Sequence, residues 1–170
     1  MKKLLLHICC APCSAGAVLF LKDDFNISYY WHNHNIWDEA EYNKRKESAK
    51  IYASNLGYSF FEGENFVYNY DEYLKTGGEI CENCYRLRLE KAAKFAKDNG
   101  FDCWTTSLLA SPYQKHELIK ELGEKIAKKY GIEFVYKDFR SKYYEGKTLA
   151  KNSGSYMQKY CACKKSLNER

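Results

Sequence analysis

The sequence predicts an α/β fold in which helices cover both faces of a parallel sheet. Short apolar or β-branched runs alternate with longer helical patterns, which is the arrangement of βαβ units. Apolar residues make up 45% and aromatic residues 16% of the 170 residues, enough for a substantial core. The chain shows no internal repeat and no linker, so we expect residues 1–170 to form one domain.

The first half of the chain carries three predicted strands and two predicted helices. Apolar, aromatic and β-branched runs of strand length predict strands at 3–8, 26–31 and 58–61. The small apolar residues 14–21 suit a helix that packs on the first strand. Apolar residues at helical spacing predict a second helix over 38–56, which Gly57 ends.

The second half continues the alternation after an irregular stretch at 62–80, in which we expect a short helix near 70–74. Further helices are expected at 84–99 and 111–130, and further strands at 102–107 and 132–136. The second of these helices begins at Ser111, because Ser111, Pro112 and Gln114 fit the N-cap, first and third positions of a capping box. From Asp138 onward we expect an irregular, cysteine-containing tail.

Charge and hydropathy exclude several classes of protein. The longest apolar run near the start, residues 4–6, is far too short for a signal-peptide core or a membrane span. We therefore expect a soluble, cytoplasmic protein with no membrane partner. The formal net charge of +5 permits nucleic acid as a partner without requiring it.

Eight cysteines, in a chain without an export signal, are expected to be reduced and to bind metal. Seven of them form three tight groups, and these predicted ligands are Cys9, Cys10, Cys13, Cys81, Cys84, Cys161 and Cys163. Two C-x-x-C pairs alone would suit one zinc ion. The adjacent Cys9 and Cys10 are expected to point apart, so seven thiols exceed one zinc site and favour an iron–sulfur cluster with further thiolates.

Two other classes stay open on the residues alone. A zinc-stabilised nucleic-acid-binding module would be colourless and redox-inactive. A thiol–disulfide oxidoreductase would need only one cysteine pair and no metal. Cys103, in the middle of a predicted strand, is interpreted as a packing residue rather than a ligand.

Several long motifs resemble one known family, the QueH type of epoxyqueuosine reductase. They are HICCAPC at 7–13, CENCYRLRLE at 81–90, TTSLLASPYQKHELIK at 105–120, KDFR at 137–140 and MQKYCAC at 157–163. The resemblance implies a Rossmann-like fold of the HUP/PP-loop-related class, holding a 4Fe-4S cluster with an additional mononuclear iron beside it. It also implies a cobalamin-independent oxidoreductase that removes the epoxide oxygen of epoxyqueuosine at the wobble base of tRNA.

Two loops differ from related patterns. The family more often has a proline where this chain has His34, and we expect His34 to stabilise the loop rather than to bind metal. The loop at 9–14 contains Pro12 and no glycine, so it does not match a phosphate-binding loop. We therefore expect no ATP.

Site residues are expected at strand ends and beside the cysteines. Asp138, just past a strand end beside Arg140, is the favoured proton donor, with Asp102 and Tyr113 as further candidates. Substrate contacts are expected from Asn35, Arg86, Thr106, Ser111, Gln114, Arg140 and Tyr160.

The expected partners are the anticodon stem-loop of tRNA and an electron donor. Basic residues that could contact the tRNA are Arg86, Arg88, Lys91, Lys94 and Lys97 on one helix and Lys142, Lys147, Lys151, Lys159, Lys164 and Lys165 in the tail. Tyr143, Tyr144 and Tyr160 are stacking candidates. A low-potential ferredoxin or flavodoxin would supply the electrons.

Overall fold

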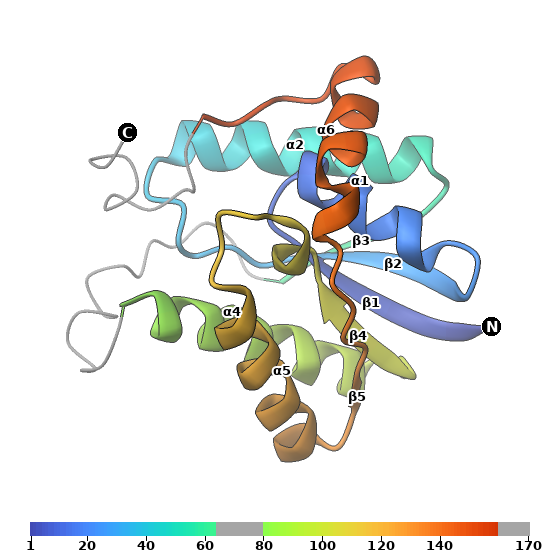
Figure 1. Cartoon of the computed structure of the whole chain (residues 1–170), viewed down its shortest axis with the longest axis vertical. Coiled ribbons are helices and arrows are strands. Elements are labelled where there is room, and N and C mark those ends of the chain that lie inside the picture. Colours follow the sequence, from blue (N-terminus) through green and yellow to red (C-terminus); the bar gives the residue numbers. More distant parts are fainter. Residues whose placement is uncertain (64–79, 160–170) are drawn as a thin grey trace.

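The computed structural model describes residues 1–63 and 80–159, and its centre is a five-stranded parallel sheet. The order is β3-β2-β1-β4-β5, as in a doubly wound fold (Figure 1). The strands are β1 (Lys2–Ile8), β2 (Phe25–Trp31), β3 (Ser59–Glu62), β4 (Cys103–Thr106) and β5 (Glu133–Phe134). The predicted short helix near 70–74, together with Tyr160, Cys161 and Cys163, lies outside the described residues.

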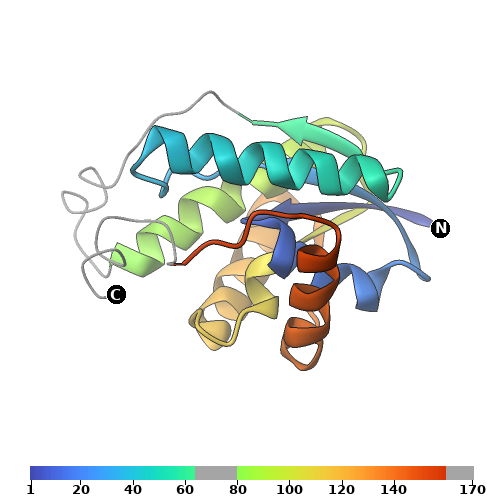
Figure 2. The same ribbon diagram turned by 90° about the horizontal axis from the view of Figure 1, so that it is seen from above.

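Helices cover both faces of the sheet, as predicted. One face carries α1 (Ala11–Leu21), α2 (Glu39–Asn55) and α6 (Tyr143–Asn152), and the other carries α4 (Ile80–Asp98) and α5 (His116–Tyr130) (Figures 1 and 2). Two short 3-10 helices, η1 (Ser107–Ala110) and η2 (Arg140–Lys142), connect these elements. None of the helices described is both long and apolar enough to span a membrane.

The central strand β1 explains where the site forms. Its residues Leu4, Leu5 and Leu6 are fully buried, because β2 and β4 flank it and helices cover both of its faces. All strands run in the same direction, so the loops after β1, β2 and β4 leave the same edge of the sheet. Ligands of doubly wound sheets bind at this edge, where the strand order reverses.

Two helices begin earlier than the sequence predicts. The first begins at Ala11 rather than residue 14, because Pro12 needs no backbone partner in a first turn and the Cys10 carbonyl accepts from Ser14 N at 3.2 Å. The helix α4 begins at Ile80, so its first turn includes Cys81 and Cys84.

The predicted start of α5 at Ser111 is wrong, since this helix begins at His116. Ser111 has an extended backbone and accepts from Tyr113 N at 3.2 Å, which makes a local turn. Gln114 does not complete a capping box, because its Oε1 accepts from the Tyr85 hydroxyl at 2.6 Å. A tertiary contact to α4 thus replaces the local capping interaction.

The tail is more regular than predicted, because residues 143–152 form α6. This helix packs on α1 through small residues, with Gly146 against Gly16. Its ten residues are fewer than the roughly 11–18 over which helical periodicity is usually recognised, which explains why the sequence pattern does not indicate a helix here. The last strand is also shorter than predicted and is confined to Glu133–Phe134.

Candidate metal and substrate site

Three cysteine thiols converge just after β1. The Sγ atoms of Cys9, Cys10 and Cys13 all lie within 4.8 Å of one another. Cys10 is the N-cap of α1 and Cys13 lies in its first turn, where the helix dipole favours negative charge. The sequence predicts these three residues as metal ligands, and the fold brings their thiols together.

The expectation that Cys9 and Cys10 point apart is wrong. Their Sγ atoms are 3.8 Å apart, because the chain bends at Cys9 before the helix begins. Two thiolates that share one tetrahedral metal at about 2.3 Å stand roughly 3.8 Å apart. Adjacent cysteines can therefore serve one metal centre in this loop.

The chemistry of the three thiols fits a metal. Hydrogen bonds from the thiols of Cys13 and Cys9 lower the pKa of Cys10, and donating to Cys10 raises the pKa of Cys9 to about 11 and that of Cys13 above its usual value. In the metal-free protein a negative charge on one of these sulfur atoms therefore disfavours ionisation of its neighbours. A bound cation would allow all three to be thiolates, and soft thiolates are the ligands that iron–sulfur clusters require.

The second cysteine pair is carried by α4. Cys81 and Cys84 are partly buried, and neither belongs to the group of three thiols described above. Cys84 Sγ accepts from Arg88 Nη2 at 3.4 Å. Cys103 is fully buried in β4 and packs in the core, in agreement with the sequence interpretation.

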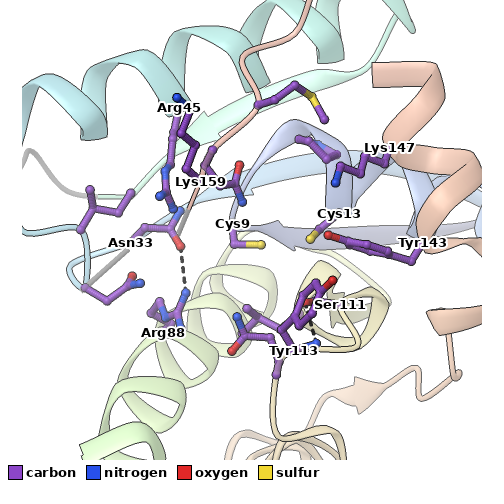
Figure 3. Close-up of a pocket in the computed structure, with 17 residues that line it drawn as sticks. Cys9, Cys13, Asn33, Arg45, Arg88, Ser111, Tyr113, Tyr143, Lys147 and Lys159 are labelled. Carbon is purple, nitrogen blue, oxygen red and sulfur yellow. Dashed lines mark hydrogen bonds between the residues drawn. The ribbon is translucent and has the colours of Figure 1, made fainter. Parts of the chain in front are cut away.

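A cavity of about 580 Å³ opens beside the three thiols. Cys9 and Cys13 line it, together with Asn33 and Asn35 from the loop after β2 and Ser111 from the segment after η1 (Figure 3). The further lining residues are Pro12, Ile36, Arg45, Arg88, Leu108, Tyr113, Gln114, Tyr143, Lys147, Met157, Gln158 and Lys159. The loops after three strands thus meet at one edge of the sheet, in agreement with the expectation that site residues lie at strand ends.

The charged residues that line this cavity are cations. Its lining includes the cations Arg45, Arg88, Lys147 and Lys159, and no carboxylate occurs among the lining residues that the structure describes. Arg45 forms a salt bridge of 2.9 Å with Glu41, one turn earlier on α2. The excess of cations makes the cavity attractive to anions.

Two aromatic rings form one wall of the cavity. Tyr113 and Tyr143 lie 6.0 Å apart in an edge-to-face arrangement, and Figure 3 shows Tyr143 projecting from α6 toward Cys13. Burial, and then the nearby sulfur atoms of Cys13 and Cys10, raise the pKa of Tyr143. Its hydroxyl is therefore protonated at neutral pH. The sequence predicts only a stacking role for Tyr143.

Thr106 and His7 do not line the cavity, but they hold the loop after β2 in place through hydrogen bonds. His7 Nε2 donates to the His32 carbonyl at 3.1 Å, so Nδ1 accepts from the Thr106 hydroxyl at 2.9 Å. Burial, and then the charge of Arg88, lower the pKa of His7 to about 4, so this histidine is neutral. His34 is buried in the same loop, with its ring 4.0 Å from that of His32.

The two aspartates proposed as proton donors do not lie in the cavity. Asp102 precedes β4 at the opposite edge of the sheet, where its carboxylate accepts from Lys3 N at 2.8 Å. Asp138 accepts from Arg140 Nη2 at 2.7 Å, and this contact lowers the pKa of Asp138 to about 2. Of the three candidates, the structure brings only Tyr113 to the cavity.

The predicted substrate contacts divide in the same way. Asn35, Ser111 and Gln114 line the cavity, whereas Arg86 and Arg140 are exposed outside it. Among the basic residues of α4, Arg88 is 2% exposed and is not a surface residue. Asn33 and Arg45 also line the cavity and are not among the residues predicted from the sequence. The position of Asn33 after a strand, and that of Arg45 on a helix that faces the same loop, are the signals for them.

Comparison with known proteins identifies the family. A model of the family described as "Epoxyqueuosine reductase QueH" matches residues 4–169. The chain belongs to this family. A relative named epoxyqueuosine reductase QueH from Thermotoga maritima is 35% identical, with 100% of this chain and 93% of the relative covered. Another from Dehalococcoides mccartyi is 33% identical, with 99% and 94% covered.

A solved structure supports the fold of the QueH chain. It is described as a predicted subunit of tRNA methyltransferase from Methanocaldococcus jannaschii. The TM-score is 0.54 at 13% identity, over 87% of this chain and 74% of the other. This likeness agrees with the Rossmann-like sheet, and the QueH family provides the argument about function.

Proposed function

We propose that this chain reduces epoxyqueuosine to queuosine at the wobble base of tRNA, without cobalamin. The observation that carries the proposal is the convergence of Cys9, Cys10 and Cys13 beside a cation-lined cavity in a chain of the QueH family. The reaction breaks both C–O bonds of the epoxide and forms one C=C bond. It consumes two electrons and two protons, and the oxygen leaves as water.

The cysteines are the proposed metal ligands. Cys9, Cys10, Cys13, Cys81 and Cys84, with Cys161 and Cys163 from the C-terminal segment, would hold a 4Fe-4S cluster and an additional mononuclear iron. When bound, these groups would supply the electrons and a Lewis acid for the departing oxygen. Ser107 would support this ligand set, because its hydroxyl lies 3.5 Å from Cys9 Sγ and accepts from Cys9 N at 3.2 Å.

The cavity is the proposed site of the modified nucleotide. The wobble base lies in an unpaired loop of tRNA, where proteins stack bases on aromatic rings and bind phosphates with cations. Tyr113 and Tyr143 provide the aromatic wall, and Lys147 and Lys159 the cations at its border. Asn35 Oδ1 is buried without a hydrogen-bond partner among the described residues, so it is available to accept from a base N–H.

A tyrosine is the proposed proton donor. Tyr143 and Tyr113 both line the cavity, and Tyr143 stays protonated because its environment disfavours the phenolate. Asp138 fits this role poorly, since Arg140 keeps its carboxylate ionised. The Asp138–Arg140 pair is instead interpreted as a structural contact.

The electron donor is proposed to be a low-potential ferredoxin or flavodoxin. Protein iron–sulfur clusters span roughly −700 to +450 mV, so a donor at the low end of this range can reduce most of them. The basic character of the chain, with a net charge of +5, is compatible with an acidic donor as well as with tRNA.

The test is a single-turnover assay with the full chain, purified and reconstituted without oxygen and without cobalamin. The substrate is tRNA that carries epoxyqueuosine, dithionite is the reductant, and nucleosides are quantified by mass spectrometry. We expect queuosine to form with a brown protein that contains iron and sulfide. A colourless zinc protein, or an iron–sulfur protein that leaves epoxyqueuosine intact, would contradict the proposal.

A further inference from the structure

Arg88 is a buried cation that contacts a proposed cluster ligand. Its side chain is 2% exposed, although the sequence predicts it among the basic residues that could contact tRNA. The guanidinium Nη2 donates to Cys84 Sγ at 3.4 Å, and Nη1 donates to Asn33 Oδ1 at 3.3 Å. Arg88 and Cys84 both lie on α4, one turn apart, so the helix itself sets their contact.

Asn33 extends the contact to the other cysteine group. Its Nδ2 donates to the Ile8 carbonyl at 2.9 Å, which requires that Oδ1 faces Arg88. Ile8 is the last residue of β1 and directly precedes Cys9. Three hydrogen bonds therefore connect the sulfur of Cys84 to the backbone that carries the three converging thiols. Figure 3 shows Arg88 and Asn33 side by side at one border of the cavity, with Cys9 beyond them.

We infer that Arg88 positions Cys84 against the Cys9 loop and raises the reduction potential of the bound iron–sulfur cluster. The inference rests on the proposed function, in which Cys84 is a cluster ligand. N–H···S hydrogen bonds withdraw electron density from a ligating sulfur, and a buried positive charge favours the more negative, reduced cluster. Weak screening in the interior makes this charge effective.

This role is compatible with the electrostatics of the surrounding groups. His7 is neutral because burial and the charge of Arg88 itself disfavour its protonation. The guanidinium also lies 5.8 Å from the centroid of the Tyr85 ring, which packs it between α4 and the loop after β2. Arg88 is therefore a positioning residue fixed on several sides, not a mobile surface cation.

The experiment compares Arg88→Gln with Arg86→Gln in the anaerobically reconstituted full chain. Arg86 is the matched control because it lies on the same helix, two residues away, and is exposed. Midpoint potentials are measured by redox titration followed by electron paramagnetic resonance, with iron and sulfide content determined in parallel. We expect Arg88→Gln to lower the ratio of reduced to oxidised cluster about tenfold at a fixed potential, or ~59 mV for one electron. Arg86→Gln should leave this ratio unchanged.

A second measurement uses the wild-type chain. Labelling with ¹⁵N-arginine should give a weak ¹⁵N hyperfine coupling to the reduced cluster, which Arg88→Lys removes or alters and Arg86→Lys does not. A wild-type potential in Arg88→Gln at full iron content, or no ¹⁵N coupling in the wild-type protein, overturns the role of Arg88. A wild-type protein that binds no iron and sulfide contradicts the proposed function instead, so the two failures are distinguishable.

Discussion

Gly146 in α6 lies directly against the backbone of Gly16 in α1. A Cβ atom at Gly146 would stand 2.6 Å from Gly16 Cα, closer than real Cβ contacts, so only glycine allows this approach. The same helix α6 brings Tyr143 and Lys147 to the cavity. The close helix contact therefore fixes one wall of the proposed substrate site.

Gly146→Ala should separate α6 from α1. Because the added methyl group meets backbone atoms that cannot rotate away, we expect a loss of about 1–3 kcal/mol in the free energy of unfolding. Chemical denaturation followed by circular dichroism measures this loss. Lys151→Ala, at an exposed position of the same helix, is the control and should change stability by less than about 0.5 kcal/mol. Equal stability of the two variants would contradict the tight contact.

Removing one converging thiol should remove the metal. Cys13→Ser replaces a soft thiolate with a hydroxyl that binds iron poorly, and we expect loss of most iron, sulfide and brown absorbance. Cys103→Ser is the matched control, because Cys103 is buried in β4 among core residues. Its iron content should equal that of the wild-type protein. Full iron retention in Cys13→Ser would exclude this thiol from the ligand set.

The sequence was sufficient to place the site but not to complete it. Alternating apolar runs locate β1, β2 and β4, and the carboxyl ends of parallel strands lie at one edge of the sheet. Asn35, which follows β2, could therefore be associated with the cysteines from the amino-acid pattern alone. Capping patterns read from the sequence were less reliable where a side chain distant in the sequence forms a hydrogen bond with one of the capping residues. The apparent helix start at Ser111 failed because Tyr85 of α4 binds Gln114.

Buried polar residues were the main omission. Arg88 looks like one of several surface cations on α4, and only the packing of this helix beside the loop after β2 buries it. Its spacing of four residues from Cys84 is the signal that could have indicated it, since such residues are neighbours on a helix. Asp102 is predicted as a site residue but does not lie in the cavity. It precedes β4, and residues that precede a strand of a parallel sheet lie at the edge opposite to the residues that follow it.

Tyr143→Phe and Asp138→Asn should separate the two proton-donor hypotheses. Removal of the Tyr143 hydroxyl should slow single-turnover reduction by roughly 100-fold or more, because general acids contribute about 10²–10⁴-fold. Binding of the tRNA should be preserved, since the ring remains. Asp138→Asn removes a carboxylate held by Arg140 outside the cavity, and its rate should stay within about twofold of wild type. The reverse pattern would restore Asp138 as the donor.

Stability of the metal-free protein should decrease below neutral pH because of His32. Both ring nitrogens of His32 are buried without hydrogen-bond partners among the described residues, and burial lowers its pKa to about 2. Below about pH 6.5 the unfolded chain binds a proton that the folded chain excludes, so the free energy of unfolding falls as the pH falls.

The expected loss from this group alone is about 2 kcal/mol between about pH 7 and 5, and its slope approaches roughly 1.4 kcal/mol per pH unit at the acidic end. His32→Phe should remove this contribution to the pH dependence of the free energy of unfolding. The contribution of His7, whose pKa is lowered to about 4, should remain. Denaturant titrations at several pH values, with reductant present, measure both slopes. An identical slope in variant and wild type would show that His32 can be protonated in the folded protein.

Binding of tRNA should depend steeply on salt, with Lys147 as one of the phosphate contacts. Each phosphate contact in a single-stranded loop contributes about 0.7 to the slope of log K against log salt concentration. Lys147 borders the cavity, and Lys147→Gln should weaken the binding of an anticodon stem-loop and reduce this slope by about that amount. Lys125→Gln is the control, because Lys125 lies on α5, pairs with Glu121 at 2.9 Å and does not line the cavity. An unchanged slope in Lys147→Gln would show that Lys147 does not contact a phosphate. Binding without any salt dependence in the wild-type protein would argue against tRNA as the partner of this surface.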